Sequence, residues 1–307
     1  MDKSVEREAA ARSQVAAAPA IAVRFFLIPL LVVGATVLVY IGFRSLLSEE
    51  RSAGEYLTDI RSGGSNRRWP AAYELSRLMA DPEFAKDEEA ALAPELTKAF
   101  AESKNDDPRV RQYLALTLGR LTPPLNADAR QLLVDALKDP DSQTRINAIW
   151  ALGSTREVSV ASDIARTYGS DDAGMRKMAV YALGSMPHDV GNETLVKALE
   201  DPEADVQWNA AVALARHGRH EGVAVLGRML DRSYVERNVT RQQQPREDVD
   251  PVGEVIINGL RAIAALQDAT LAEQVKALST NDPDLKVRQA ASEALKTQRE
   301  VPERIRR

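Results

Sequence analysis

Several stretches of the chain between residues 106 and 297 share one pattern of apolar and polar positions. Each begins with an Asp-containing turn and continues into a segment in which a polar residue, usually Arg, serves as a reference point. The third and sixth residues after it are usually Ala and the seventh is Leu, as in the segment that starts at Arg145. Because these positions lie on one face of an α-helix, the pattern predicts an amphipathic helix in each stretch.

The pattern recurs in one frame along the chain. Its reference positions are Arg68, Arg111, Arg145, Arg176, Gln207, Gly259 and Arg288. The central copies are spaced by about 31 to 34 residues, a period typical of repeat proteins. Second amphipathic stretches lie between them, for example over 128–138 and 158–168, so each unit is predicted to be two antiparallel helices. Asp-Pro or Asp-Asp before each reference helix supplies capping chemistry at its start.

This arrangement resembles HEAT repeats, specifically the short variety called PBS-lyase HEAT-like repeats, over about residues 52–298. The resemblance implies an all-α fold, an α-solenoid of about seven HEAT-like helix pairs. It also implies that the Asp and Arg of each unit pair with neighbouring units and hold the stack in register. The repeat does not specify a function, because many binding proteins and a few enzymes share it.

A different pattern stands near the N-terminus. Residues 25–43 read FFLIPLLVVGATVLVYIGF, an uncharged run between Arg24 and Arg44. A helix of about 19 residues spans roughly 28 Å, close to the thickness of a bilayer core, and no convincing signal-peptide cleavage site follows the run. The sequence therefore predicts a transmembrane helix over 23–47, preceded by a mobile tail over 1–22. Four basic residues before the span favour a single-pass membrane protein with an extracytoplasmic solenoid.

The remaining boundaries follow from breaks in the period. The solenoid is predicted over 48–298 and a C-terminal tail over 299–307. Between Gln207 and Gly259 the spacing stretches to about 52 residues, and the extra segment 231–252 is polar. We expect an inserted surface loop there. It can be a neutral insertion or a part of a binding face, and the sequence leaves both open.

The positions that point away from the predicted core hold large apolar side chains. If the third, sixth and seventh positions face the core, the first and fifth face outward. In HEAT-like stacks the second helix of each unit usually lines the concave side, so the resemblance implies a groove there. The predicted partner-binding residues on this concave face are Trp69, Tyr73, Leu116, Ile146, Trp150, Tyr181, Trp208 and Val212. Such aromatic side chains bind a peptide or a partner helix, or else pack laterally between repeats.

The amino-acid composition excludes several kinds of binding and catalytic chemistry. The chain has 40 Lys+Arg against 45 Asp+Glu and a net charge of −5, which argues against a general nucleic-acid binder. It has no Cys and three His, so thiol catalysis and zinc fingers are excluded and little remains for a metal site. No phosphate loop, dinucleotide fingerprint or hydrolase elbow is present. We therefore expect no cofactor, no metal and no catalytic residues.

Together these features favour a membrane-anchored HEAT-repeat scaffold or adaptor that binds a protein partner through its concave face without catalysis. One alternative is a non-catalytic structural subunit of a larger membrane complex, whose span packs on other spans. The other is a bilin-lyase-like enzyme or enzyme subunit, since the repeat also resembles that of phycobilin lyases.

Overall fold

The computed structural model describes residues 28–47, 51–187, 189–239 and 250–305, and within these ranges all regular secondary structure is helical. The chain divides into two compact units, Met1–Ser52 and Ala53–Arg307. They are described separately.

The first unit contains helix α2, Ile28–Leu47. No helix among the described residues is both long enough and apolar enough to cross a membrane. Among the described residues, α2 holds about 16 residues of the apolar run before Arg44, which as a helix span roughly 24 Å, less than the ~30 Å of a bilayer core. The prediction of a single-pass membrane protein with an extracytoplasmic solenoid is therefore wrong. The predicted tail over 1–22 lies outside the described residues.

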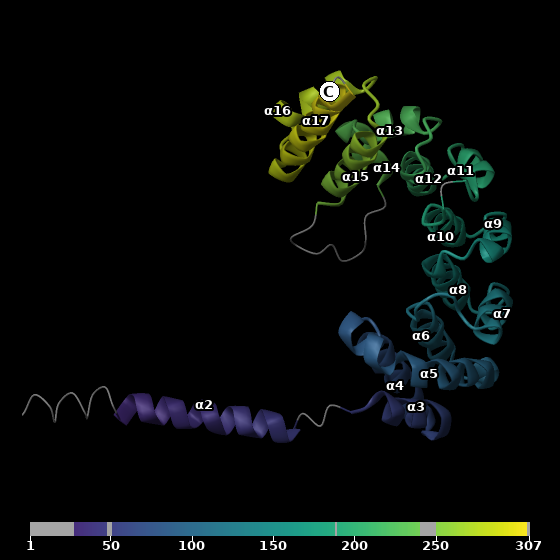
Figure 1. The fold of residues 1–307 in the computed structure, drawn as a ribbon, viewed down its shortest axis with the longest axis vertical. Coiled ribbons are helices and arrows are strands. Elements are labelled where there is room, and N and C mark those ends of the chain that lie inside the picture. Colours follow the sequence, from purple (N-terminus) through teal and green to yellow (C-terminus); the bar gives the residue numbers. More distant parts are fainter. Residues whose placement is uncertain (1–27, 48–50, 188, 240–249, 306–307) are drawn as a thin grey trace, which may run out of the picture. The chain divides into compact units, whose positions relative to one another are not determined.

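The second unit is an α-solenoid whose helices alternate between two rows (Figure 1). The inner row consists of α4 (Ser65–Leu78), α6 (Pro108–Leu118), α8 (Ser142–Thr155), α10 (Ala173–Leu183), α12 (Ala204–Arg216), α15 (Pro251–Leu266) and α17 (Leu285–Ile305). The outer row consists of α3 (Ala53–Ser62), α5 (Pro82–Glu102), α7 (Ala127–Ala136), α9 (Ala161–Thr167), α11 (Asn192–Ala198), α13 (Val223–Met229) and α16 (Ala272–Asn281).

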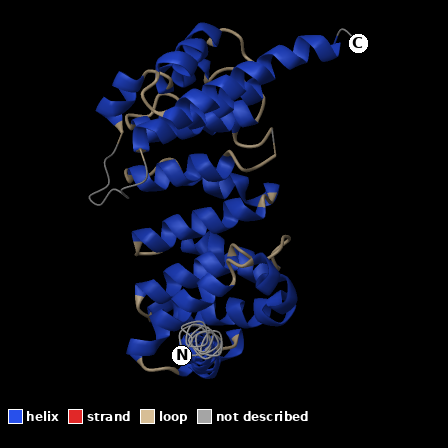
Figure 2. Ribbon diagram, turned by 90° about the vertical axis from the view of Figure 1, so that its left-hand side faces the viewer, coloured by secondary structure: helices blue, strands red, loops and turns tan. Residues whose placement is uncertain are grey.

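Each inner helix contacts the inner helix that precedes it and the one that follows it. Within this unit the inner row lies on the concave side of the stack (Figure 1), and Figure 2 shows the inner helices lying one above another. The helix pairs follow the frame of the sequence repeat, so the predicted all-helical repeat solenoid is confirmed.

Several inner helices begin at an Asp that caps them, whereas α4 and α12 begin without a side-chain cap. Asp107, Asp141 and Asp172 each precede a helix and accept a hydrogen bond from a backbone N–H of its first turn, at 3.0, 2.7 and 2.8 Å. Asp250 does the same for α15 at 3.0 Å. Such caps satisfy donors that have no partner within the helix and contribute about 1 kcal/mol each.

Small side chains set the distance between successive inner helices. A Cβ atom added to Gly153 would lie 2.6 Å from the Cβ of Ala182, and one added to Gly184 would lie 2.4 Å from the Cβ of Ala213. The Ala is the sixth-position residue of the next repeat, and the Gly lies two positions after the sixth in the preceding one. A seam of Gly against Ala therefore runs along the stack and allows close approach of the helices.

The apolar core forms two clusters that meet in α12. The first extends from Ala53 to Leu214 and the second from Trp208 to Ala294. The seventh-position leucines of the first five repeats are fully buried in the first cluster. These are Leu75, Leu118, Leu152, Leu183 and Leu214.

Two predicted irregular segments are partly helical. Arg232–Asn238, within the expected loop over 231–252, form helix α14, and residues 240–249 lie outside the described residues. Asp231 caps α14 and Val235 is fully buried against the second cluster, so one cap and one apolar residue suffice to fold this segment onto the stack. At the other boundary, α17 continues to Ile305, through most of the tail expected over 299–307. Arg and Glu, which favour helix, make up four of the seven residues from 299 to 305.

Candidate functional site

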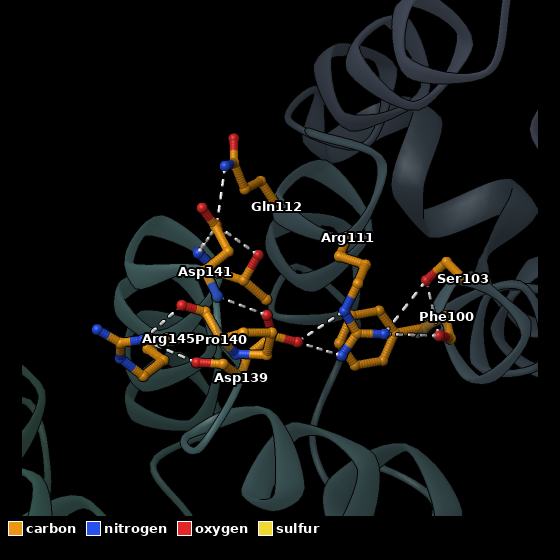
Figure 3. Close-up of polar contacts among 9 residues, drawn as sticks. Phe100, Ser103, Arg111, Gln112, Asp139, Pro140, Asp141 and Arg145 are labelled. Atoms are coloured by element: carbon orange, nitrogen blue, oxygen red, sulfur yellow. Dashed lines mark hydrogen bonds and ion pairs between the residues drawn. The ribbon is translucent and has the colours of Figure 1, made fainter. Parts of the chain in front are cut away.

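Buried ion pairs between Arg and Asp side chains join neighbouring units of the stack. Arg111 of α6 donates to Asp139 at the start of the next pair, with Nε–Oδ2 at 2.7 Å and Nη2–Oδ2 at 2.6 Å (Figure 3). The same guanidinium lies over the Phe100 ring, 4.7 Å from its centroid. Asp139 and Arg111 are both largely buried. Figure 3 shows the pair lying between two successive repeats.

An equivalent pair joins α10 to the next unit. Arg176 donates to both oxygens of Asp201 at 2.9 and 3.0 Å, and the Tyr168 hydroxyl donates to the same carboxylate at 3.0 Å. Burial alone would raise the pKa of Asp201, but the donors from Arg176, Tyr168 and the Glu203 backbone N–H hold it below its ordinary value. The expected pairing of Asp and Arg between units is thus confirmed at these two junctions. Arg145 differs, because its printed hydrogen bonds go to the backbone carbonyls of Asp139 and Pro140 and to the Met175 sulfur.

In the sixth repeat the reference Arg is missing, and an Arg from another helix makes the equivalent ion pair. Gly259 occupies the reference position of the sixth repeat, and Arg232 of α14 takes over its role. It donates to Asp282 at 2.7 Å from Nη2 and 3.0 Å from Nε. The inserted segment therefore supplies the cation that holds the last repeat in register.

The outward face of the inner helices is the second place where candidate functional side chains gather. Tyr73 of α4 is 39% exposed and Tyr181 of α10 is 46% exposed. Five other predicted site residues are half-buried along the same row. They are Trp69, Leu116, Ile146, Trp150 and Val212. We call these seven residues the inner-row face.

Neighbouring groups hold several of these rings in place. The Tyr73 and Tyr113 rings meet edge to face, with centroids 5.2 Å apart. The Arg109 guanidinium lies 4.4 Å from the centroid of the Trp69 ring. Rings held in this way lose little rotational freedom when a ligand covers them, which favours binding. Tyr113 was not among the predicted site residues, because it stands one position outside the outward columns; its proximity to the aromatic column was the available signal.

Trp208 does not belong to the inner-row face. Its side chain is 4% exposed and packs in the second apolar cluster, with the Tyr234 ring edge-on at 6.5 Å. Its indole N–H is buried without a hydrogen-bond partner among the described residues. This differs from the predicted position on the concave surface. The cause is α14, whose Tyr234 covers the indole and whose fold the repeat pattern could not foresee.

No group of three or more His, Asp or Glu side chains within the described ranges has an arrangement suited to a metal ion. The chemistry of the inner-row face is that of a contact surface, made of rings, aliphatic side chains and guanidinium groups.

Comparison with protein families matches the HEAT repeats over residues 93–177 and 164–242. Residues 93–242 carry HEAT repeats. Comparison with curated proteins yields no match.

Three solved structures illustrate the similarity. A complex of CpcE and CpcF of phycocyanin lyase from Nostoc sp. is 16% identical, with a TM-score of 0.49 over 81% of this chain and 95% of that chain. An archaeal HEAT-like repeats protein from Thermococcus onnurineus is 13% identical, with a TM-score of 0.43 over 82% and 98%. A designed armadillo repeat protein in complex with the peptide (KR)4 is 15% identical, with a TM-score of 0.44 over 81% and 100%.

The rings of the inner-row face are distributed unevenly along the solenoid. They come from α4, α8 and α10, whereas the sequences of α15 and α17 contain no aromatic residue. A surface that uses these rings is therefore confined to the inner helices α4 to α10.

Proposed function

We propose that this protein is a non-catalytic scaffold that binds a segment of a protein partner along the concave side of its inner helices. The observation that carries the proposal is the exposure of Tyr73 and Tyr181 in line with the half-buried Trp69 and Trp150. Large rings of this kind contribute most of the binding energy at many protein interfaces. A monomeric surface gains nothing from leaving them in water.

Two further features support this proposal over catalysis. Several Arg and Asp side chains of the repeats are already engaged in buried ion pairs between units, such as Arg111–Asp139 and Arg176–Asp201. Of the polar residues in the outward columns, Gln112 donates to Asp141 and Lys177 pairs with Asp205 of the next unit. These do not form the base–nucleophile arrangement that group transfer requires.

The test compares two matched double variants of the full chain. Tyr73→Ala/Tyr181→Ala removes the two exposed rings of the inner-row face. Val158→Ala/Val196→Ala removes two exposed apolar side chains, 56% and 37% exposed, from the outer side of the stack. Each protein is immobilised and used to capture partners from an extract of its own cells, followed by mass spectrometry.

A partner captured by the wild type should be retained by the valine variant and lost by the tyrosine variant. Both variants should unfold within about 1 kcal/mol of the wild type, because the altered side chains are exposed. Equal capture by all three proteins would overturn the proposal. So would gross unfolding of the tyrosine variant, because the rings would then be packing residues.

A further inference from the structure

Three arginines mark the C-terminal ends of inner helices. Arg120 follows α6, Arg156 follows α8 and Arg216 ends α12. Each donates to a backbone carbonyl near the end of another inner helix: Arg120 to Ser76, Arg156 to Ser185 at 2.8 Å, and Arg216 to Gly184 at 3.1 Å. We call these three residues the arginine strip. The strip runs along one edge of the inner-row face.

The arginine strip lacks counter-ions. Among the described residues, Arg111 and Arg176 pair with buried carboxylates, whereas no carboxylate lies within ion-pair distance of Arg120, Arg156 or Arg216. A guanidinium has five N–H donors, and each member of the strip uses one of them. The carbonyls at a helix end carry only a fractional negative charge, so they leave most of the positive charge unbalanced.

Arg120 is the most desolvated member. It is half-buried, and its guanidinium lies 5.8 Å from the centroid of the Trp150 ring. Burial lowers its pKa because no anion offsets the loss of water. An anionic ligand beside Arg120 would offset this loss of water.

The other two arginines share a pocket with the inner-row face. A pocket of about 420 Å³ between α8, α10 and α12 is lined by Ser154, Arg156, Tyr181, Ser185 and Arg216, and none of the described residues that line it is acidic. Arg156 and Arg216 are exposed there. Tyr181, the most exposed ring of the inner-row face, thus stands in the same pocket as two cations with free donors.

The charge of this edge is opposite to that of the whole chain, which is −5. At the opposite ends of the same helices the acidic residues are occupied as caps, as in Asp141 and Asp172. From this complementarity we infer that the partner segment is acidic: its Asp or Glu carboxylates bind Arg156 and Arg216 while an apolar residue beside them packs on Tyr181. This inference rests on the proposed function, since it names the chemistry of the segment that occupies the inner-row face.

The test begins with a randomised library of 12-residue peptides displayed on phage and selected against the full chain. Selected peptides should be enriched in Asp and Glu, and their affinity should fall when NaCl is raised from 50 to 300 mM. Arg156→Gln/Arg216→Gln should weaken binding by about tenfold or more, since both charge-assisted contacts are lost. Arg156→Lys/Arg216→Lys should recover part of the affinity by keeping the charge.

The matched control is Arg166→Gln/Arg261→Gln, which removes the same charge from exposed positions on α9 and α15, outside the pocket. It should bind the selected peptides as the wild type does. Enrichment of neutral or basic sequences only, no enrichment, or equal weakening by the control would overturn the inference. Peptides that lose affinity in Tyr73→Ala/Tyr181→Ala but not in the arginine variant would overturn it while supporting the proposed function. The reverse pattern would support acidic recognition and overturn the aromatic face.

Discussion

At the scale of the residue, Asp201 shows how the stack manages buried charge. Its carboxylate accepts from Arg176 of α10, from the Tyr168 hydroxyl at the end of α9, and from the Glu203 backbone N–H. A buried carboxylate without such donors would cost several kcal/mol. The network therefore forms only when both repeats are in register. It helps to specify the register of the stack as well as to stabilise it.

Tyr168 gives this network a measurable pH dependence. Burial and the hydrogen bond to Asp201 raise its pKa to about 12, above the value of about 10 expected in the unfolded chain. The folded state thus keeps a proton that the unfolded state releases between these pH values. The contribution is intact below about pH 10, and the free energy of unfolding should fall by up to about 3 kcal/mol as the pH rises to 12.

Urea unfolding at a series of pH values measures this fall. Tyr168→Phe should flatten the dependence between pH 10 and 12, while Tyr181→Phe, which alters an exposed ring, should leave it as in the wild type. An unchanged slope in Tyr168→Phe would show that another group is responsible.

At the scale of the element, the close packing of successive inner helices depends on glycines that have no side chain at the contact. Gly119, Gly153 and Gly184 each face an Ala of the next inner helix, and a Cβ at any of them would lie within 2.7 Å of that Ala. Contact at this distance forces the helices apart. The curvature of the inner row thus depends on these glycines.

We expect Gly153→Ala to destabilise the protein by about 1–3 kcal/mol, although Ala favours a helix by about 1 kcal/mol over Gly. The comparison is Gly227→Ala in the outer helix α13, where the nearest atoms are the side-chain ends of Leu271 and Gln274, at 3.2 and 3.6 Å, which can move. That change should be neutral or mildly stabilising. Thermal or denaturant unfolding of both variants measures the difference, and stabilisation by Gly153→Ala would contradict the role of the seam.

At the scale of the whole solenoid, stability is divided between two apolar clusters that meet in α12. In a repeat stack each unit contacts only its neighbours, so local damage should stay local. Arg232 is the main ionic link to the last repeat, because its partner Asp282 is buried and Gly259 supplies no cation.

Arg232→Ala should therefore accelerate amide hydrogen exchange in α15 to α17 by at least about tenfold, because it leaves a buried carboxylate unpaired. Exchange in α4 to α8 should not change. Arg166→Ala, which breaks an exposed pair with Asp163, should affect neither region. Uniform loss of protection along the chain would show that the stack unfolds as one unit.

Much of this architecture was predictable because it rests on local periodicity. The spacing of Ala and Leu after Arg145 sets one face of a helix whatever surrounds it, and the capping residues Asp107, Asp141 and Asp172 act within one turn. The same periodicity placed Tyr73 and Tyr181 on the outward side, where the structure shows them exposed. Their role in binding stays a prediction.

The sequence by itself thus determined the repeat, its frame, its caps and the composition of its outward columns. Only the tertiary structure decided that Trp208 is buried under α14, that Arg232 replaces the Arg missing at Gly259, and that Arg156 and Arg216 share a pocket with Tyr181. It also showed that, among the described residues, no helix is both long enough and apolar enough to cross a membrane, although the sequence has an apolar run near the N-terminus. The physical reason is range: periodicity is set between neighbours along the chain, whereas burial and charge pairing depend on segments brought together by folding.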